Sequence, residues 1–271
     1  MKFLYLKTAL VSLFSLLILQ GCAKSRSFSP PLHGESVHFS ATVPNALEVL
    51  PISATYRSKI CRKERRNANG GSYTIPGVHR AMYPLSIGQP NQVKVSIPEL
   101  GGGQCDWKLS NIRFEVKLKD PSKIDSLISK NFGTEVTFVF DNNAPQIFDG
   151  GYEKKSGNIN ETLILFPLLV KDFMSGNIFK SYLIAKSDPL TYKVHMTTSI
   201  NLNVIYKKQM LSVWTGRKNN NRPFMTYPNG EIVYGEVRPD YKKTARNIRI
   251  KQYEIIYYSR YFYVDKRHLL C

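Results

Sequence analysis

The sequence lacks recognisable catalytic motifs and has few acidic residues. It contains neither the G-x-S-x-G elbow of serine hydrolases nor the H-E-x-x-H zinc motif, and no C-x-x-C pair. Its five histidines are scattered, and 20 acidic residues stand against 38 basic ones. Carboxylate pairs of the glycosidase type need no motif, but the scarcity of acids argues against them. The sequence therefore favours a protein that is not an enzyme and that needs no cofactor or metal ion.

No apolar run is long enough to cross a membrane. Residues 9–19 form a run of about 11 residues, whereas a membrane-spanning helix needs roughly 20. Lys2 and Lys7 precede this run, and a small residue and a cysteine follow it. This layout is typical of a secretory signal peptide. We therefore expect residues 1–21 to be removed and the polar, Ser/Pro-rich residues 22–35 to form a tether.

The residues Leu19-Gln20-Gly21-Cys22 resemble the lipobox of bacterial lipoproteins. In that family the cysteine thiol receives a diacylglycerol group, and the cysteine becomes the mature N-terminus. Gln20 is bulkier than the usual residue at its position, and Ala23 in place of Asp resembles lipoproteins sorted to the outer membrane. The resemblance implies a protein anchored by lipid at Cys22 to the periplasmic face of the outer membrane. The alternative is an ordinary cleaved signal peptide with a chance cysteine.

The charge balance indicates an acidic partner. Residues 1–21 contain two lysines and no acid, so their removal lowers the formal net charge from +18 to +16. In a cytosolic protein this charge would suggest nucleic acid. For an exported protein the acidic partners are anionic lipids, cell-wall polymers or an acidic protein, which such charge attracts at low salt. We therefore expect no nucleic-acid partner.

Two of the four cysteines are expected to form a disulfide. Cys61 and Cys105 lie in the same half of a chain that reaches an oxidising compartment, where disulfides persist. Trp107 follows Cys105 by two residues, so both side chains would lie on one face of a strand and the indole would pack over the bridge. Cys271 is then left unpaired, although the sequence does not rank the possible connectivities.

Hydrophobic alternation with a period of two predicts a mainly β fold, an antiparallel β-sandwich. The alternating segments are residues 37–43, 93–97, 112–118, 136–140 and 192–206, and residues 247–250 and 254–264 are also expected strands. Asn229-Gly230 predicts a hairpin. The polar stretch 141–161 suggests two β-rich lobes, residues 36–149 and 150–271, or a single domain.

Two segments depart from simple alternation. A short helix is expected near residues 121–131, because Asp120 can cap it, Pro121 suits its first position and Gly133 can end it. The apolar run 163–170 contains Pro167, which cannot donate a backbone hydrogen bond. This run is therefore expected to be an edge strand, a bulge or two short elements.

Two segments rich in basic residues are candidate partner-binding surfaces. Tyr and Arg together are typical of protein interfaces, because both combine a large contact area with hydrogen bonding. The alternatives are a solvated loop for the first segment and tyrosines packed on a sheet for the second. The candidate residues are Arg57, Arg62, Lys63, Arg65 and Arg66 in the first segment, and Arg249, Tyr257 and Arg260 in the second.

The Cys61 and Cys105 pair beside Asp106-Trp107, in a basic β-rich lipoprotein, is similar to lipoproteins encoded beside type VI secretion effectors. The resemblance covers residues 50–120. Those proteins are immunity proteins that hold a periplasmic toxin, such as a phospholipase, and block its active site. The resemblance implies stoichiometric inhibition of a protein toxin without catalysis. The alternative is a structural or accessory envelope lipoprotein that binds anionic polymers or a secretion apparatus.

Overall fold

The computed structural model describes residues 27–88, 91–144, 151–173, 176–186, 189–217 and 221–235. Several predictions concern other parts of the chain and lie outside these described residues. They are the signal peptide and Cys22, the boundary between residues 149 and 150, the strands at 247–250 and 254–264, the candidates Arg249, Tyr257 and Arg260, and Cys271.

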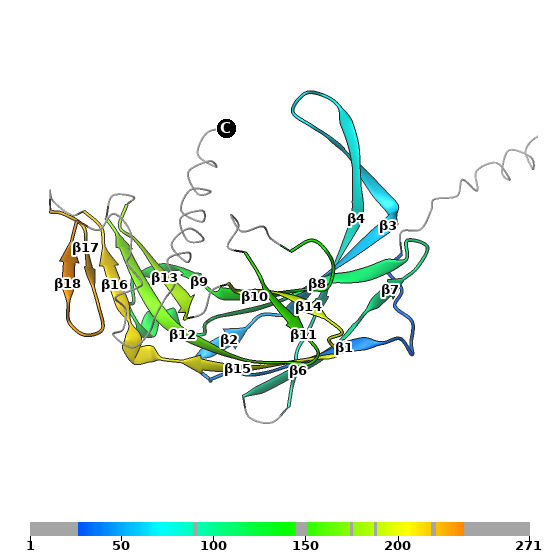
Figure 1. The fold of residues 1–271 in the computed structure, drawn as a ribbon. Helices are drawn as coiled ribbons and strands as arrows, with labels where there is room; N and C mark the ends of the chain where they lie inside the picture. The colour runs from blue at the N-terminus through cyan, green and yellow to red at the C-terminus, as the bar shows by residue number, and fades with distance from the viewer. Residues whose placement is uncertain are drawn as a thin grey trace, which may run out of the picture.

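Within the described residues the strands form two sheets that face each other as a sandwich (Figure 1). The larger sheet has ten strands in the order β18-β17-β16-β12-β15-β1-β6-β5, with β13 also paired to β12 and β9 to β13. Their bounds are β1 Ser36–Thr42, β5 Ser86–Ile87, β6 Gln92–Pro98, β9 Ile128–Phe132, β12 Ile159–Asp172, β13 Ile178–Ala185, β15 Ser199–Tyr206, β16 Ser212–Thr215, β17 Phe224–Thr226 and β18 Ile232–Tyr234.

The smaller sheet has eight strands in the order β11-β14-β10-β8-β3-β4, and both β2 and β7 pair with β8. Their bounds are β2 Leu47–Val49, β3 Ile52–Arg66, β4 Ser72–Tyr83, β7 Leu100–Gly102, β8 Trp107–Leu118, β10 Thr134–Val139, β11 Glu153–Ser156 and β14 Thr191–His195. Two single-turn 3-10 helices, η1 (Pro121–Lys123) and η3 (Lys208–Met210), complete the described elements.

The main core lies between the two sheets. Phe39 of β1 contacts Phe114 of β8 and Phe138 of β10, with ring centroids 5.2 and 6.5 Å apart, and all three side chains are buried. The alternation of β1, β6, β8 and β10 directs one face of each strand into this core. The predicted mainly β, sandwich-like fold is therefore confirmed.

A smaller core lies on the other face of the ten-stranded sheet. Leu165 of β12 belongs to the main core, whereas the next residue, Phe166, packs with Leu168 and with Met225 of β17. Successive residues of a strand point to opposite faces, so this half of β12 buries both of its sides. The short hairpin β17–β18, which the Asn229-Gly230 pair correctly predicted, extends the same sheet and adds Met225 and Val233 to this second core.

The strand directions differ from the expected antiparallel arrangement. β1 pairs antiparallel with β6 but parallel with β15, and β10 pairs antiparallel with β8 but parallel with β14. Both parallel pairs join strands from opposite sides of residue 150. The segments before and after that residue therefore contribute to both sheets and do not form one sheet each.

The short helix expected near residues 121–131 begins at Pro121 as predicted but is only a single 3-10 turn. Only η1 is helical there, and the chain then enters β9. The Asp125 carboxylate accepts the backbone N–H of Leu127 and pairs with Lys171 of β12 at 2.8 Å; both contacts, with Lys171 the larger, lower its pKa. This side-chain bond turns the backbone away from a helix and leaves Leu127 exposed.

Pro167 does not place β12 at an edge. Lys207 N–H donates to the Leu165 carbonyl on the β15 side, so Pro167, two residues on, faces the same side. β12 pairs with β15 only up to Leu165 and with β16 only from Leu168. The missing N–H therefore falls in the gap between two successive neighbours, and the strand continues without a break.

The single alternating segment 192–206 is two strands. Met196 has a φ of +50°, and there the chain leaves β14 in the smaller sheet and enters β15 in the larger one. The Thr197 hydroxyl donates to the Gly157 carbonyl at 2.8 Å and holds the crossing. Alternation continues through both strands because each buries one face, so the pattern alone does not reveal the change of sheet.

Candidate functional site: a basic arm and the cleft at its root

The β3–β4 hairpin extends beyond the sheet to which it belongs (Figure 1). β8 pairs with β3 only from Ser53 to Arg57, whereas β3 and β4 remain paired as far as Arg66 and Ser72. We call residues 59–76 the basic arm. At its tip the Asn67 side chain accepts the N–H groups of Asn69 and Gly71 and closes the turn.

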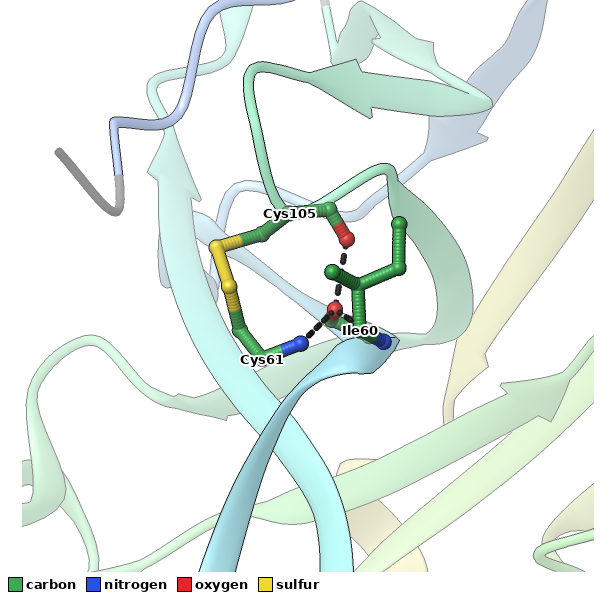
Figure 2. The surroundings of a disulfide bond; sticks show 4 residues. Ile60, Cys61 and Cys105 are labelled. Atoms are coloured by element: carbon green, nitrogen blue, oxygen red, sulfur yellow. Dashed lines mark hydrogen bonds between the residues drawn. A yellow bond between two sulfur atoms is a disulfide. The ribbon is translucent and has the colours of Figure 1, made fainter. Parts of the chain in front are cut away.

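The root of the basic arm is fixed by the predicted disulfide, which is confirmed (Figure 2). Cys61 and Cys105 are joined with a Cα–Cα distance of 5.3 Å. Beside them, the buried Ser58 hydroxyl accepts the N–H groups of Ile60 and Cys61 at 3.1 and 2.8 Å and donates to the Cys105 carbonyl. One hydroxyl and one disulfide thus join the arm to the turn before β8.

A large β-bulge bends β3 at the root of the basic arm. Ser58 pairs with Gly77 and Lys63 with Ile75, so four residues of β3 stand opposite Pro76 alone. A Cβ atom at Gly77 would lie 2.0 Å from the Cys61 carbonyl oxygen. Glycine is therefore required for the close approach of the two strands at this bend.

Trp107 is buried, as expected, but for a different reason. Cys105 lies in a turn, and Asp106 has a φ of +46°, so the cysteine and the tryptophan do not share a strand face. Trp107 is the first residue of β8, and its indole packs against His79 of β4, with ring centroids 5.7 Å apart. Trp107 and Cys105 nevertheless belong to the same buried cluster.

The two faces of the basic arm differ in charge. Arg65 pairs with Tyr73 and Lys63 with Ile75, and residues in register share a face of a two-stranded ribbon. This face carries two exposed cations, the half-exposed Tyr73 and no acid. The other face carries Arg62 and Arg66 with Glu64 between them. None of these four cations forms an ion pair with a described residue.

Arg57 lies at the root and not on the arm. Its Nε donates to the Ser110 hydroxyl at 3.0 Å and lies 3.6 Å from Asp141. Of the five predicted contact residues in this segment, the structure therefore brings Arg62, Lys63, Arg65 and Arg66 together and separates Arg57 from them.

A cleft of about 820 Å³ opens at the root of the arm. Its walls come from β3, β4, the start of β8 and the turn before it, the loop after β10, and the strands β11 and β14. It is lined by two acidic residues, Asp106 and Asp141, and by six basic ones: Arg57, Lys59, Lys108, Lys154, Lys155 and Lys193. Sequence reasoning missed this cleft, because its lysines come from distant segments.

Three of the six cations have carboxylate partners. Arg57 and Lys108 lie near Asp141 and Asp106, at 3.6 and 3.4 Å. Lys155 contacts Glu161 at 2.7 Å and Glu153 at 2.9 Å, and these hydrogen bonds raise its pKa. The Lys155 ammonium lies over the ring of Tyr192, whose pKa burial raises to about 12. These cations are already neutralised by the fold.

The other three cations have no carboxylate partner among the described residues. Lys59 and Lys154 are exposed, and Lys193 donates to the Asn142 side-chain oxygen at 3.0 Å. Lys154 and Lys193 are direct partners across the parallel pair β11–β14, so their side chains share one face. Like charges placed side by side repel each other, and an anion in the cleft would relieve that repulsion.

Comparison with protein-family models, curated proteins and solved structures gave no match. In the described ranges no helix has the length and apolarity needed to span a membrane. The same residues contain no cluster of His, Cys, Asp and Glu suited to a metal ion. His195 lines the cleft, but no second histidine does. The arrangement of charges in the arm and the cleft is thus the basis for a functional proposal.

Proposed function

We propose that the protein is a periplasmic inhibitor that binds an acidic protein toxin one to one, as an immunity protein of the type VI secretion kind. The observation that supports this most directly is the acid-free face of the basic arm, with Lys63, Arg65 and Tyr73. A projecting ribbon of this kind can enter the cleft of another protein. Its charges would accelerate association with an acidic surface, and its aromatic ring would slow release.

The location is part of this proposal. Lipid on Cys22 would hold the protein at the outer membrane and place the arm in the periplasm, where a delivered toxin acts. Changing Cys22 to Ala should leave the protein exported but release it from the outer-membrane fraction. A variant that still fractionates with the outer membrane would contradict the anchor.

The proposal is tested with the product of the neighbouring gene as the candidate effector. Cells that lack the gene should die when this effector reaches their periplasm, and the two purified proteins should form a one-to-one complex. Lys63→Glu with Arg65→Glu should chiefly slow association. Tyr73→Ala should speed dissociation and cost about 2 kcal/mol or more of binding free energy if the ring is a hot spot.

Two matched double variants serve as controls. Lys94→Glu with Lys208→Glu makes the same charge change on exposed residues of β6 and η3, away from the arm. Arg62→Glu with Arg66→Glu reverses the other face of the arm and shows which face is used. Unchanged survival together with salt-sensitive binding to many anionic polymers would favour the envelope lipoprotein instead.

A further inference from the structure

The crowded lysines of the cleft point to a ligand different from a protein toxin. The cleft is concave and of a size typical for small-molecule sites, whereas the acid-free face of the arm is an open ribbon. Its lining carries a formal net charge of +4, because two of its eight charged side chains are acidic and six are basic. The ligand is therefore an anion small enough to enter the cleft.

The kind of cation favours phosphate. Five of the six basic side chains are lysines. The sixth, Arg57, has its Nε engaged by Ser110 and Asp141, so the side-on fork that Nε forms with an Nη group is already occupied. Lysines bind phosphate as point charges from several directions. Lys59, Lys154 and Lys193 are the three without carboxylate partners and would surround such a group.

The remaining lining suits a body that bears hydroxyl groups. Asp106 and Asp141 can accept hydrogen bonds from hydroxyls. The Asn142 side-chain oxygen accepts from Lys193, and its amide N–H groups donate to no described residue. Phe140 and Leu109 add apolar surface, on which the C–H face of a sugar ring can pack. Charged, polar and apolar groups of this kind together are complementary to a phosphorylated carbohydrate.

We propose that this cleft binds a phosphorylated sugar, with Lys59, Lys154 and Lys193 contacting its phosphate. The sugar is either a free molecule or the headgroup of a glycolipid, since both present the same chemistry. Binding relieves the repulsion between Lys154 and Lys193, so the ligand also stabilises the pairing of β11 with β14. This site does not require the toxin, and its test is independent of the inhibitor proposal.

The test is calorimetric titration of the full-length mature protein with glucose bisphosphate. We expect a Kd tighter than about 1 mM, with glucose at least about a hundredfold weaker. Lys59→Gln with Lys154→Gln should weaken binding at least about tenfold. Both residues are exposed and have no partner among the described residues, so the fold should survive. Lys154→Gln alone should raise the melting temperature without ligand, because it removes the repulsion.

The control is Lys63→Gln with Arg65→Gln, which removes the same charge from the arm. It should change the Kd less than about twofold. An equal loss in both double variants would mean general attraction of anions and would overturn the proposal. So would the absence of binding at millimolar concentration, or equally tight binding of a peptide of aspartate and glutamate.

The source of the sugar is then distinguished with vesicles. Phosphatidylcholine vesicles with and without lipid A, whose headgroup is a phosphorylated disaccharide, are mixed with the wild-type protein and with the Lys59→Gln, Lys154→Gln variant. Binding that needs both lipid A and the two lysines assigns the site to a lipid headgroup. Binding of glucose bisphosphate without such vesicle binding assigns it to a free sugar phosphate.

Discussion

The sandwich and the basic arm, which extends from its smaller sheet, obtain their order in different ways. In the sandwich, Phe39, Phe114 and Phe138 meet between two sheets and exclude water. Beyond Ser58 no sheet within the described residues faces the arm, and its side chains are mostly exposed. Its position depends on Ser58, on the disulfide and on the glycine at position 77.

This difference separates residues that maintain the fold from residues free to make contacts. Substitutions in the sandwich change stability, because each apolar side chain is surrounded by others. Substitutions on the outer arm alter a surface that the fold does not need. The root lies between these two cases, since its bonds hold both the arm and one wall of the cleft.

The largest expected effect contrasts the two regions directly. Phe114→Ala should lower the free energy of unfolding by about 3–5 kcal/mol, because it opens a cavity between the sheets. Tyr73→Ala on the arm should change it by less than about 0.5 kcal/mol. Urea unfolding of both variants measures this. A Tyr73 variant as unstable as the Phe114 variant would show that the arm packs against something in the folded protein.

Removal of the disulfide should have the next largest effect on stability. Cys61→Ser with Cys105→Ser should cost roughly 2–5 kcal/mol, because the bridge closes a loop between residues 44 positions apart. Limited proteolysis should then cut the arm faster than the sandwich. Reduced wild-type protein is the control and should behave as the variant does. Equal stability with and without the bridge would mean that Ser58 alone holds the root.

Gly77→Ala tests the bend at the root. The new methyl group would meet the Cys61 carbonyl at 2.0 Å, so β3 and β4 must separate, at a cost of about 1–3 kcal/mol. Gly70→Asn at the tip is the control, because nothing lies within 4 Å of its Cβ position and asparagine tolerates a positive φ. Thermal unfolding with equal losses at both positions would contradict the close approach.

The smallest effect depends on pH. Glu115 of β8 stands opposite Glu135 of β10, and burial, with the neighbouring Glu135, raises its pKa although Lys117 partly opposes this. A raised pKa means that stability is complete below the ordinary value and falls as pH rises through the folded value. Glu115→Gln should therefore raise the melting temperature at neutral pH, by less than about 3 °C, and leave it unchanged in acid.

Glu64→Gln on the arm is the matched control for Glu115. Glu64 is exposed and stands opposite Thr74, so its substitution should leave the melting temperature the same at both pH values. If Glu115→Gln destabilised the protein at neutral pH, the repulsion between the two carboxylates across β8 and β10 would be compensated by a contact of the charged form.

Much of the fold could be predicted because local patterns decide it. Alternation identified β1, β6, β8 and β10, and Asn229-Gly230 identified the β17–β18 hairpin. Prediction from local patterns failed where neighbouring strands determine the structure, as for Pro167 between β15 and β16. It also failed where a single turn redirects the chain, as at Met196 and Asp125. Local propensity carries no information about which strands become neighbours.

The candidate site was predicted only in part, for the same reason. A run of basic residues in one segment is visible in the sequence, and it marks the arm. Lys154 and Lys193 are neighbours only because β11 and β14 pair in parallel. The two strands that separate them in the sequence, β12 and β13, lie in the other sheet. No spacing in the sequence signals this pairing.

The parallel pairing of β1 with β15 has a consequence for how the chain folds. Ser40 and its neighbour Asn201 are 161 residues apart, so the first strand to be synthesised keeps one edge unpaired until nearly all of the described chain has followed. Contacts this distant in sequence slow folding, and open strand edges attract other chains. Folding should therefore be completed only after synthesis of the whole domain, and any fragment that ends before residue 199 should aggregate.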